Sequence, residues 1–132
     1  MARFGLAFAD NLRAYVKLHG AARPRARRGD IFTFDVANVF REGIREAFLG
    51  SEGRHMRRTI REDDFVRETT LHVNDIYPDD IPMTTMPPTL LRLLPPLPEP
   101  LAYRIIGDAL VLQDVNTNAI VDFIPDAIPG LR

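Results

Sequence analysis

Four residues near the middle of the chain have the side-chain types that bind metal ions. His72, Asp75, Asp79 and Asp80 lie in the segment HVNDIYPDD, residues 72–80. Imidazole and carboxylate groups bind transition metals when they converge in space. These four residues are therefore the candidate ligands of a weak transition-metal site. We favour the simpler interpretation, a turn in which Asn74 and Asp75 bond their own backbone while the two later carboxylates face water.

Arginines gathered in the first half of the chain form a second candidate site. Guanidinium groups bind carboxylates and phosphates with directed hydrogen bonds. Acidic residues are interspersed among these arginines, but aromatic side chains, which would stack on bases, are not interspersed among them. We therefore favour a solvated surface or an acidic protein partner over nucleic acid, which stays an alternative. The candidate partner-binding residues are Arg23, Arg25, Arg27, Arg28, Arg54, Arg57, Arg58 and Arg61.

A third pattern, Asp114-x-Asn116-x-Asn118, is typical of the start of a calcium-binding loop. An EF-hand loop also needs glycine at its sixth position and glutamate at its twelfth. Those positions hold Ala119 and Pro125. The segment is therefore predicted to be a β-turn.

Catalytic chemistry has little support. The chain has no cysteine, and the single serine, Ser51, shares a charged segment with its nearest histidine, His55. A Ser-His-Asp arrangement needs a rigid scaffold around its nucleophile. We predict no catalytic residue and no cofactor, so the chain is expected not to be an enzyme.

Charge is divided unevenly along the chain. Residues 1–67 carry 14 basic and 9 acidic side chains, whereas residues 68–132 carry 3 and 9. Such asymmetry indicates either an anionic partner or complementary halves, within one chain or between two. No run of 18 apolar residues exists, so no membrane span is expected. No export signal is recognised in the sequence as it begins. We expect a periplasmic protein if such a signal lies upstream, and otherwise a cytoplasmic one.

Residues 1–73 predict helices and one strand. Apolar residues recur at helical spacing over residues 4–19 and again from Val36 to Phe48, with Asp35 as candidate N-cap of the second helix. The charged residues 51–67 predict a short helix or an exposed arm. Residues 68–73 are rich in β-formers and predict a strand.

Proline dominates the stretch from Pro78 to Pro100. Its prolines are Pro78, Pro82, Pro87, Pro88, Pro95, Pro96, Pro98 and Pro100. Proline removes backbone donors, so regular structure is excluded over most of this stretch. Only TLLRLL, residues 89–94, predicts a helical turn, with Pro88 at its first position. The stretch is also rich in leucine, which favours an ordered extended strap over a disordered linker.

The last third of the chain predicts a β-meander. Strands are expected at 101–106, 109–113 and 119–124, with a two-residue hairpin turn at Gly107-Asp108 and a polar loop at 114–118. Alternation places Val121 and Phe123 on one face. Both faces of the sheet carry aliphatic residues, so both need cover. We expect the helices on one face and the proline strap, or a second copy of the chain, on the other.

The segments IYPDD (76–80), LLPPLP (93–98) and YRIIGDALVLQDVNTNAIVDFI (103–124) together resemble the RcnB-like family of small periplasmic nickel–cobalt homeostasis proteins. The resemblance spans residues 73–124 and rests on a proline-rich approach, a glycine turn and a strand ending in Leu-x-Asp. It implies a periplasmic metal-responsive accessory protein. Residues 1–67 have no counterpart in that family.

These patterns together predict a single α+β domain. Its expected parts are a helical basic part (1–67), a strand and proline-rich strap (68–100) and a β-meander (101–132). The predicted function is that of a small bacterial accessory or binding protein, non-enzymatic, acting through protein contacts or self-association. The alternatives are a periplasmic metal-homeostasis accessory protein and a nucleic-acid-binding protein that uses the arginines.

Overall fold

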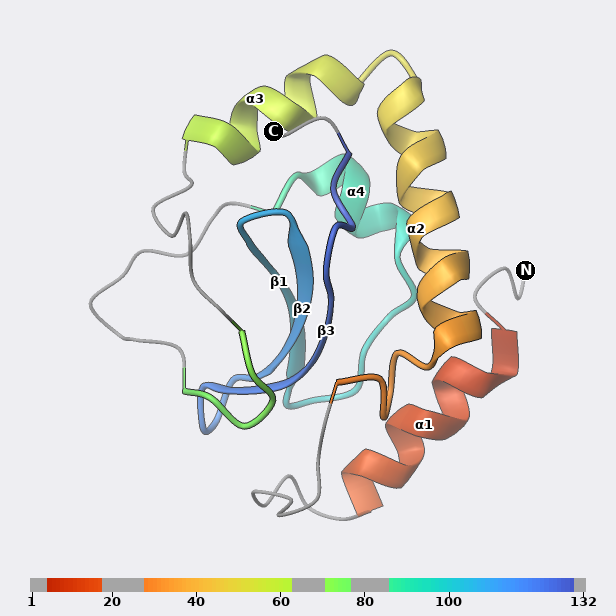
Figure 1. Cartoon of the computed structure of the whole chain (residues 1–132), viewed down its shortest axis with the longest axis vertical. Coiled ribbons are helices and arrows are strands. Elements are labelled where there is room, and N and C mark those ends of the chain that lie inside the picture. The colour runs from red at the N-terminus through yellow and green to blue at the C-terminus, as the bar shows by residue number, and fades with distance from the viewer. Residues whose placement is uncertain (1–4, 18–27, 63–70, 77–85, 130–132) are drawn as a thin grey trace.

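The computed structural model describes residues 5–17, 28–62, 71–76 and 86–129 (Figure 1). In these residues, helices precede a three-stranded antiparallel sheet with strand order β1-β2-β3. The chain therefore has an α+β fold with a small C-terminal β-meander, as the sequence predicts. The elements are α1 (Gly5–Lys17), α2 (Phe34–Leu49), α3 (Gly53–Glu62), α4 (Pro88–Leu93), β1 (Leu101–Ile106), β2 (Ala109–Asp114) and β3 (Ala119–Ile124).

The two predicted N-terminal helices are present as α1 and α2, but the predicted cap of α2 is wrong. Thr33 is the N-cap, and its carbonyl accepts the first helical hydrogen bond from the Ala37 N–H at 2.7 Å. Asp35 lies inside the first turn instead. Its negative charge there favours the positive end of the helix dipole.

The charged segment after α2 forms helix α3 over residues 53–62. Met56 and Ile60 lie one turn apart and are both fully buried, so a short apolar stripe anchors an otherwise polar helix. Arg57 adds a hydrogen bond to the Pro129 carbonyl at 2.9 Å.

The predicted strand at 68–73 is wrong over its described part. Residues 71–75 form an irregular turn in which Asn74 adopts a φ of 75°, a left-handed conformation that asparagine tolerates. Strand pairing in this segment is limited to a bridge between Ile76 and Ala119, which extends the β3 edge of the sheet. Residues 68–70 lie outside the described residues.

Helix α4 confirms the predicted helical turn, with Pro88 in its first turn. Leu90 of α4 and Leu94 just after it are buried in the same cluster as the helices α1 and α2. The Tyr103 hydroxyl also donates a hydrogen bond to the Pro95 carbonyl at 2.8 Å. The described part of the strap therefore packs on the helical side of the sheet, and its expected position on the opposite face is wrong.

The meander has the predicted turn and nearly the predicted strand bounds. β1 and β2 pair from Leu101↔Asp114 to Ile106↔Ala109, around a turn in which Gly107 has a φ of 61°. Glycine reaches this conformation without a Cβ clash. Asp114, which the sequence places in the loop, is the last residue of β2.

A β-bulge changes which residues of β3 share a face. Leu112 pairs with Asp122, but the next residue, Gln113, pairs with Ile120, so Val121 is the extra residue. Val121 is consequently buried in the helix-covered core, whereas Phe123 packs on the opposite side of the sheet. The prediction that Val121 and Phe123 share a face is wrong for this reason.

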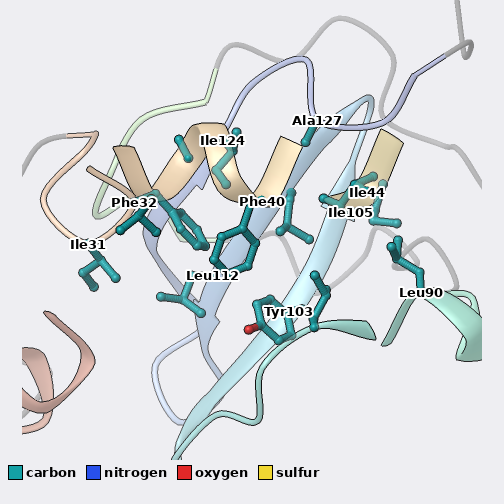
Figure 2. Close-up of a cluster of buried hydrophobic side chains, with 14 of the residues drawn as sticks. Ile31, Phe32, Phe40, Ile44, Leu90, Tyr103, Ile105, Leu112, Ile124 and Ala127 are labelled. Carbon is teal, nitrogen blue, oxygen red and sulfur yellow. The ribbon is translucent and has the colours of Figure 1, made fainter. Parts of the chain in front are cut away.

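An aromatic cluster forms the centre of the main core (Figure 2). The Phe40 ring lies 4.9 Å from the Phe8 ring and 5.1 Å from the Phe32 ring, both in edge-on contact, and Phe8 stacks on Phe32. Tyr103 of β1 approaches Phe40 from the sheet at 6.5 Å. These contacts join α1, α2, the loop before α2 and the sheet into one core.

A smaller apolar cluster lies on the other face of the sheet. It contains Ile106, Ala109, Val111 and Ile120, with Phe123 and Leu71 packed against them. Both faces of the sheet are therefore apolar, as predicted. Within the described residues, each helix is too short or too polar to cross a lipid bilayer.

Candidate functional site

Two of the four predicted metal ligands meet in the turn at residues 72–75. His72 Nδ1 lies 3.5 Å from Asp75 Oδ2, and both side chains are exposed. The same Asp75 oxygen accepts the His72 backbone N–H at 3.2 Å, and the Asp75 N–H donates to the His72 carbonyl. Backbone hydrogen bonds from Asn74 to Ile120 and from Ile120 to Asp75 fix this turn to β3.

The turn by itself offers only two ligand side chains. Asp79 and Asp80 lie outside the described residues. Among the residues that the structure does describe, no group of three or more histidine, aspartate or glutamate side chains gathers around one point. The four-residue metal site therefore stays a prediction, with one of its contacts, His72 to Asp75, observed.

The predicted arginines fall into separate places. Arg54, Arg57 and Arg58 lie on α3, whereas Arg28 lies 6.0 Å from the centre of the Phe123 ring, on the side of the smaller apolar cluster. Arg61 also belongs to α3, but its side chain is outside the described residues. Arg23, Arg25 and Arg27 lie outside them altogether.

Helix α3 presents one cationic surface, which we call the α3 face and define by Arg54, His55 and Arg58. All three side chains are exposed. Arg54 and Arg58 are one helical turn apart and therefore project in similar directions. Arg57 lies beside them but is half-buried, because its guanidinium binds the Pro129 carbonyl and lies 5.3 Å from the centre of the Phe48 ring.

Sequence reasoning missed Asp122, whose carboxylate holds the loop before α2. This side chain is 0% exposed. Its Oδ2 atom accepts the backbone N–H groups of Ile31 at 2.8 Å and Phe32 at 2.7 Å, and its Oδ1 atom accepts those of Gly29 and Phe123 at 2.9 and 2.8 Å. The carboxylate accepts all four hydrogen bonds from neutral backbone donors, and these bonds offset the free-energy cost of burying its charge.

Asp114 makes a second buried link between the halves of the chain. Its Oδ2 atom accepts the Tyr15 hydroxyl at 3.0 Å. Its Oδ1 atom accepts the backbone N–H groups of Asn116 at 2.9 Å and Thr117 at 3.3 Å, which closes the turn between β2 and β3. The Asp-x-Asn-x-Asn pattern is thus a β-turn, as predicted.

Two arginines of the first half bind carbonyls near the C-terminal end. Arg41 donates to the Pro125 carbonyl through Nη2 at 2.9 Å and Nε at 3.3 Å, and Arg57 donates to that of Pro129. The basic half and the acidic half are therefore joined by bonds that pair a charged group with a neutral one.

The buried polar residues had one usable signal in the sequence. Asp122 interrupts the apolar run AIVDFI, and an acidic residue inside a buried strand requires hydrogen-bond donors from elsewhere in the fold. The pattern reveals that donors must exist. It does not reveal that backbone N–H groups of residues 29, 31 and 32 supply them, because they are 90 or more residues away.

Comparison with protein-family models, with curated proteins and with solved structures found no match to this chain.

Proposed function

We propose that the chain is a non-enzymatic binding protein whose α3 face contacts an acidic segment of a protein partner. The observation that carries the proposal is the exposure of Arg54, His55 and Arg58 together on one helix. Carboxylates of a partner would complement the charges of Arg54 and Arg58, with each guanidinium group donating to two oxygens at once.

The underside of α3 supports the same proposal. Met56 and Ile60 are buried, and Arg57 is held by the Pro129 carbonyl and the Phe48 ring. A helix anchored in this way presents its exposed side chains without first becoming ordered, which lowers the free-energy cost of binding.

Nucleic acid is the less favoured partner for this face. The sequence of α3 contains no phenylalanine, tyrosine or tryptophan, so bases would have no aromatic ring of these types on the helix to stack upon. Phosphate contacts alone would remain, and these do not select one sequence.

The test compares two labelled probes by fluorescence anisotropy at low salt: a polyglutamate peptide and a single-stranded DNA of equal charge. We expect the peptide to bind, and Arg54→Glu and Arg58→Glu each to weaken it by about fivefold, since a surface charge contributes up to about 1 kcal/mol. Arg92→Glu is the matched control, because Arg92 is also exposed but lies on α4.

Each other outcome counts against the proposal. Equal or tighter binding of DNA, lost in the two α3 variants, would favour the nucleic-acid alternative. Peptide binding that Arg92→Glu weakens as much as Arg54→Glu would show that overall charge rather than the α3 face is responsible. Failure of the peptide to bind would overturn the proposal.

Metal binding at the 72–75 turn is a second candidate, favoured by the approach of His72 Nδ1 to Asp75 Oδ2. The resemblance to RcnB-like proteins points to nickel or cobalt as the ions to test. Isothermal titration with each ion tests this candidate directly, and absence of heat for both ions would remove it.

A further inference from the structure

The outer surface of α2 carries a line of exposed side chains, which we call the α2 seam. Its members are Phe34, Asn38, Glu42, Arg45 and Leu49, all exposed. They follow one another at steps of three or four residues, so they share one side of the helix within an arc of about 80°. In Figure 1, α2 stands at one margin of the molecule, with the sheet on its inner side.

The two ends of the α2 seam are apolar and its middle is charged. Phe34 and Leu49 are each 79% exposed, the highest values among the large apolar side chains that the structure describes as exposed. They lie about 22 Å apart along the helix axis. Glu42 and Arg45 lie between them and carry opposite charges.

The α2 seam is complementary to itself when two copies lie antiparallel. A two-fold axis close to Gly43 places Leu49 of the partner subunit between Phe34 and Asn38. The same axis places Arg45 of the partner subunit between Asn38 and Glu42. The symmetry repeats both contacts, so an apolar contact forms at each end and an arginine of one copy meets a glutamate of the other twice.

We propose that the chain forms an antiparallel homodimer through the α2 seam. Asn38, Glu42, Arg45 and Leu49 of one helix then each enter the space between two side chains of the other, as in the packing of knobs into holes. The two Glu42 carboxylates lie nearest the axis, and each has an arginine of the other copy beside it.

A parallel arrangement in register is less favourable than the antiparallel one. It would place Glu42 opposite Glu42 and Arg45 opposite Arg45, and like charges in contact are unfavourable. The antiparallel pair also brings the two Glu42 side chains near the axis, but there an arginine of the other copy lies beside each glutamate and the two Arg45 side chains stay apart. It would also align the dipoles of the two helices, whereas the antiparallel pair opposes them. The charge pattern therefore selects the antiparallel pairing.

The dimer is expected to be weak and sensitive to salt. Helix α2 has 16 residues, so it is about 24 Å long, and one helix pair buries less surface than a standard stable interface. Its central contacts are exposed ion pairs, which salt screens. This proposal concerns a different surface from the α3 face and does not depend on the function proposed for it.

Sedimentation equilibrium of the full chain, from about 10 µM to about 1 mM in low salt, tests the proposal in the range where weak complexes form. The wild-type chain is expected to dimerise. In a dimer of the Glu42→Arg chain, each new arginine lies near Arg45 of the other copy. In a dimer of the Arg45→Glu chain, each new glutamate lies near Glu42 of the other copy. Each variant alone is expected to weaken self-association by at least about tenfold, and Leu49→Ser, which removes both apolar end contacts, by a similar factor.

Mixing the two charge variants in equal amounts gives the decisive result. In a mixed dimer each arginine of the Glu42→Arg chain faces a glutamate of the Arg45→Glu chain, so both ion pairs form again. We expect the mixture to recover dimers of one chain of each variant. Because unfolded variants would not recover a specific dimer, this result also shows that both variants are folded.

The control pair has the same charge changes outside the seam. Glu52 and Arg54 are exposed and follow α2 along the chain. Glu52→Arg and Arg54→Glu are expected to leave the dimer as in the wild type, and their mixture is expected to gain nothing over either variant. If mixing the control pair increased dimer formation as much as mixing the seam pair, the attraction would come from net charge, and the proposal would be overturned.

Two other results would also overturn it. One is a wild-type chain that stays monomeric up to about 1 mM. The other is a wild-type dimer that Glu42→Arg, Arg45→Glu and Leu49→Ser leave unchanged, since association would then use a different surface.

Discussion

Replacing Asp122 by asparagine removes half of the acceptors that hold the loop before α2. The carboxylate accepts Gly29 and Phe123 with one oxygen and Ile31 and Phe32 with the other. Asparagine keeps the shape but supplies one oxygen, and its amide N–H groups would face backbone donors. Two N–H groups therefore lose their acceptor. At about 1–3 kcal/mol each, the free energy of unfolding falls by about 2–6 kcal/mol.

The loss is a large part of the stability that a domain of this size has, which is about 5–15 kcal/mol. Urea denaturation followed by far-ultraviolet circular dichroism measures it, as the chain has no tryptophan. Asp126→Asn is the matched control: Asp126 is exposed, and its φ of 54° suits asparagine. We expect a change within about 0.5 kcal/mol for the control. If Asp122→Asn unfolded at the same urea concentration as the control, the carboxylate would not hold this loop.

Three further changes test other parts of the structure. Burial raises the pKa of Tyr103 far above its ordinary value of about 10. Above pH 10 this tyrosine ionises in the unfolded chain but not in the folded one, so the free energy of unfolding is expected to fall by up to about 1.4 kcal/mol per pH unit. Tyr103→Phe is expected to remove this contribution to the pH dependence. Gly53→Ala places a Cβ 1.9 Å from the Phe48 carbonyl oxygen. It is expected to lower the free energy of unfolding, measured in urea, by about 1–3 kcal/mol. Gly50→Ala places its Cβ 3.4 Å from the Ala47 carbonyl oxygen and is expected to change this free energy less. If the turn binds nickel, His72→Ala is expected to abolish the heat of titration.

Each of these has a contrary result. The same alkaline loss of stability in Tyr103→Phe and in the wild type would place the responsible ionisation elsewhere. Equal destabilisation by Gly53→Ala and Gly50→Ala would show that the close approach at Gly53 relaxes. Undiminished nickel heat in the His72→Ala variant would move the metal site away from the turn.

Local signals predicted the elements whose shape depends on neighbouring residues. Gly107 with Asp108 marks a two-residue turn, and the flanking strands follow from β-forming side chains. Pro88 likewise begins α4 because a proline at the first helical position loses no hydrogen bond. In both cases the deciding interaction spans only a few residues, so the sequence displays it directly.

The misplaced features depend on contacts between distant residues. Thr33 rather than Asp35 is the N-cap of α2, because Asp122 of β3 accepts the backbone N–H groups of Ile31 and Phe32 and so fixes the chain just before the helix. The β-bulge at Val121 is invisible to a strict alternation of faces, since the extra residue is defined only by the pairing with β2. Propensity and periodicity contain no information about either contact.

The candidate sites divide in the same way. The cationic α3 face follows from spacing within one helix once that helix exists. Arg57 belongs to the same run of arginines in the sequence, but the structure uses it to bind the Pro129 carbonyl. Residue type alone does not separate an arginine that packs within the fold from one that faces solvent.

The bonds from Asp122 and Asp114 and from Arg41 also bear on how the protein is made. They join residues separated by 84 to 99 positions in the sequence, and each needs a partner that lies between Asp114 and Pro125. A ribosome releases this segment after α1 and α2, so these two helices emerge with their apolar faces uncovered. The nascent polypeptide therefore completes this core only after β3 has left the ribosome, and a shortened product that ends before β3 would expose the surface on which chaperones and proteases act.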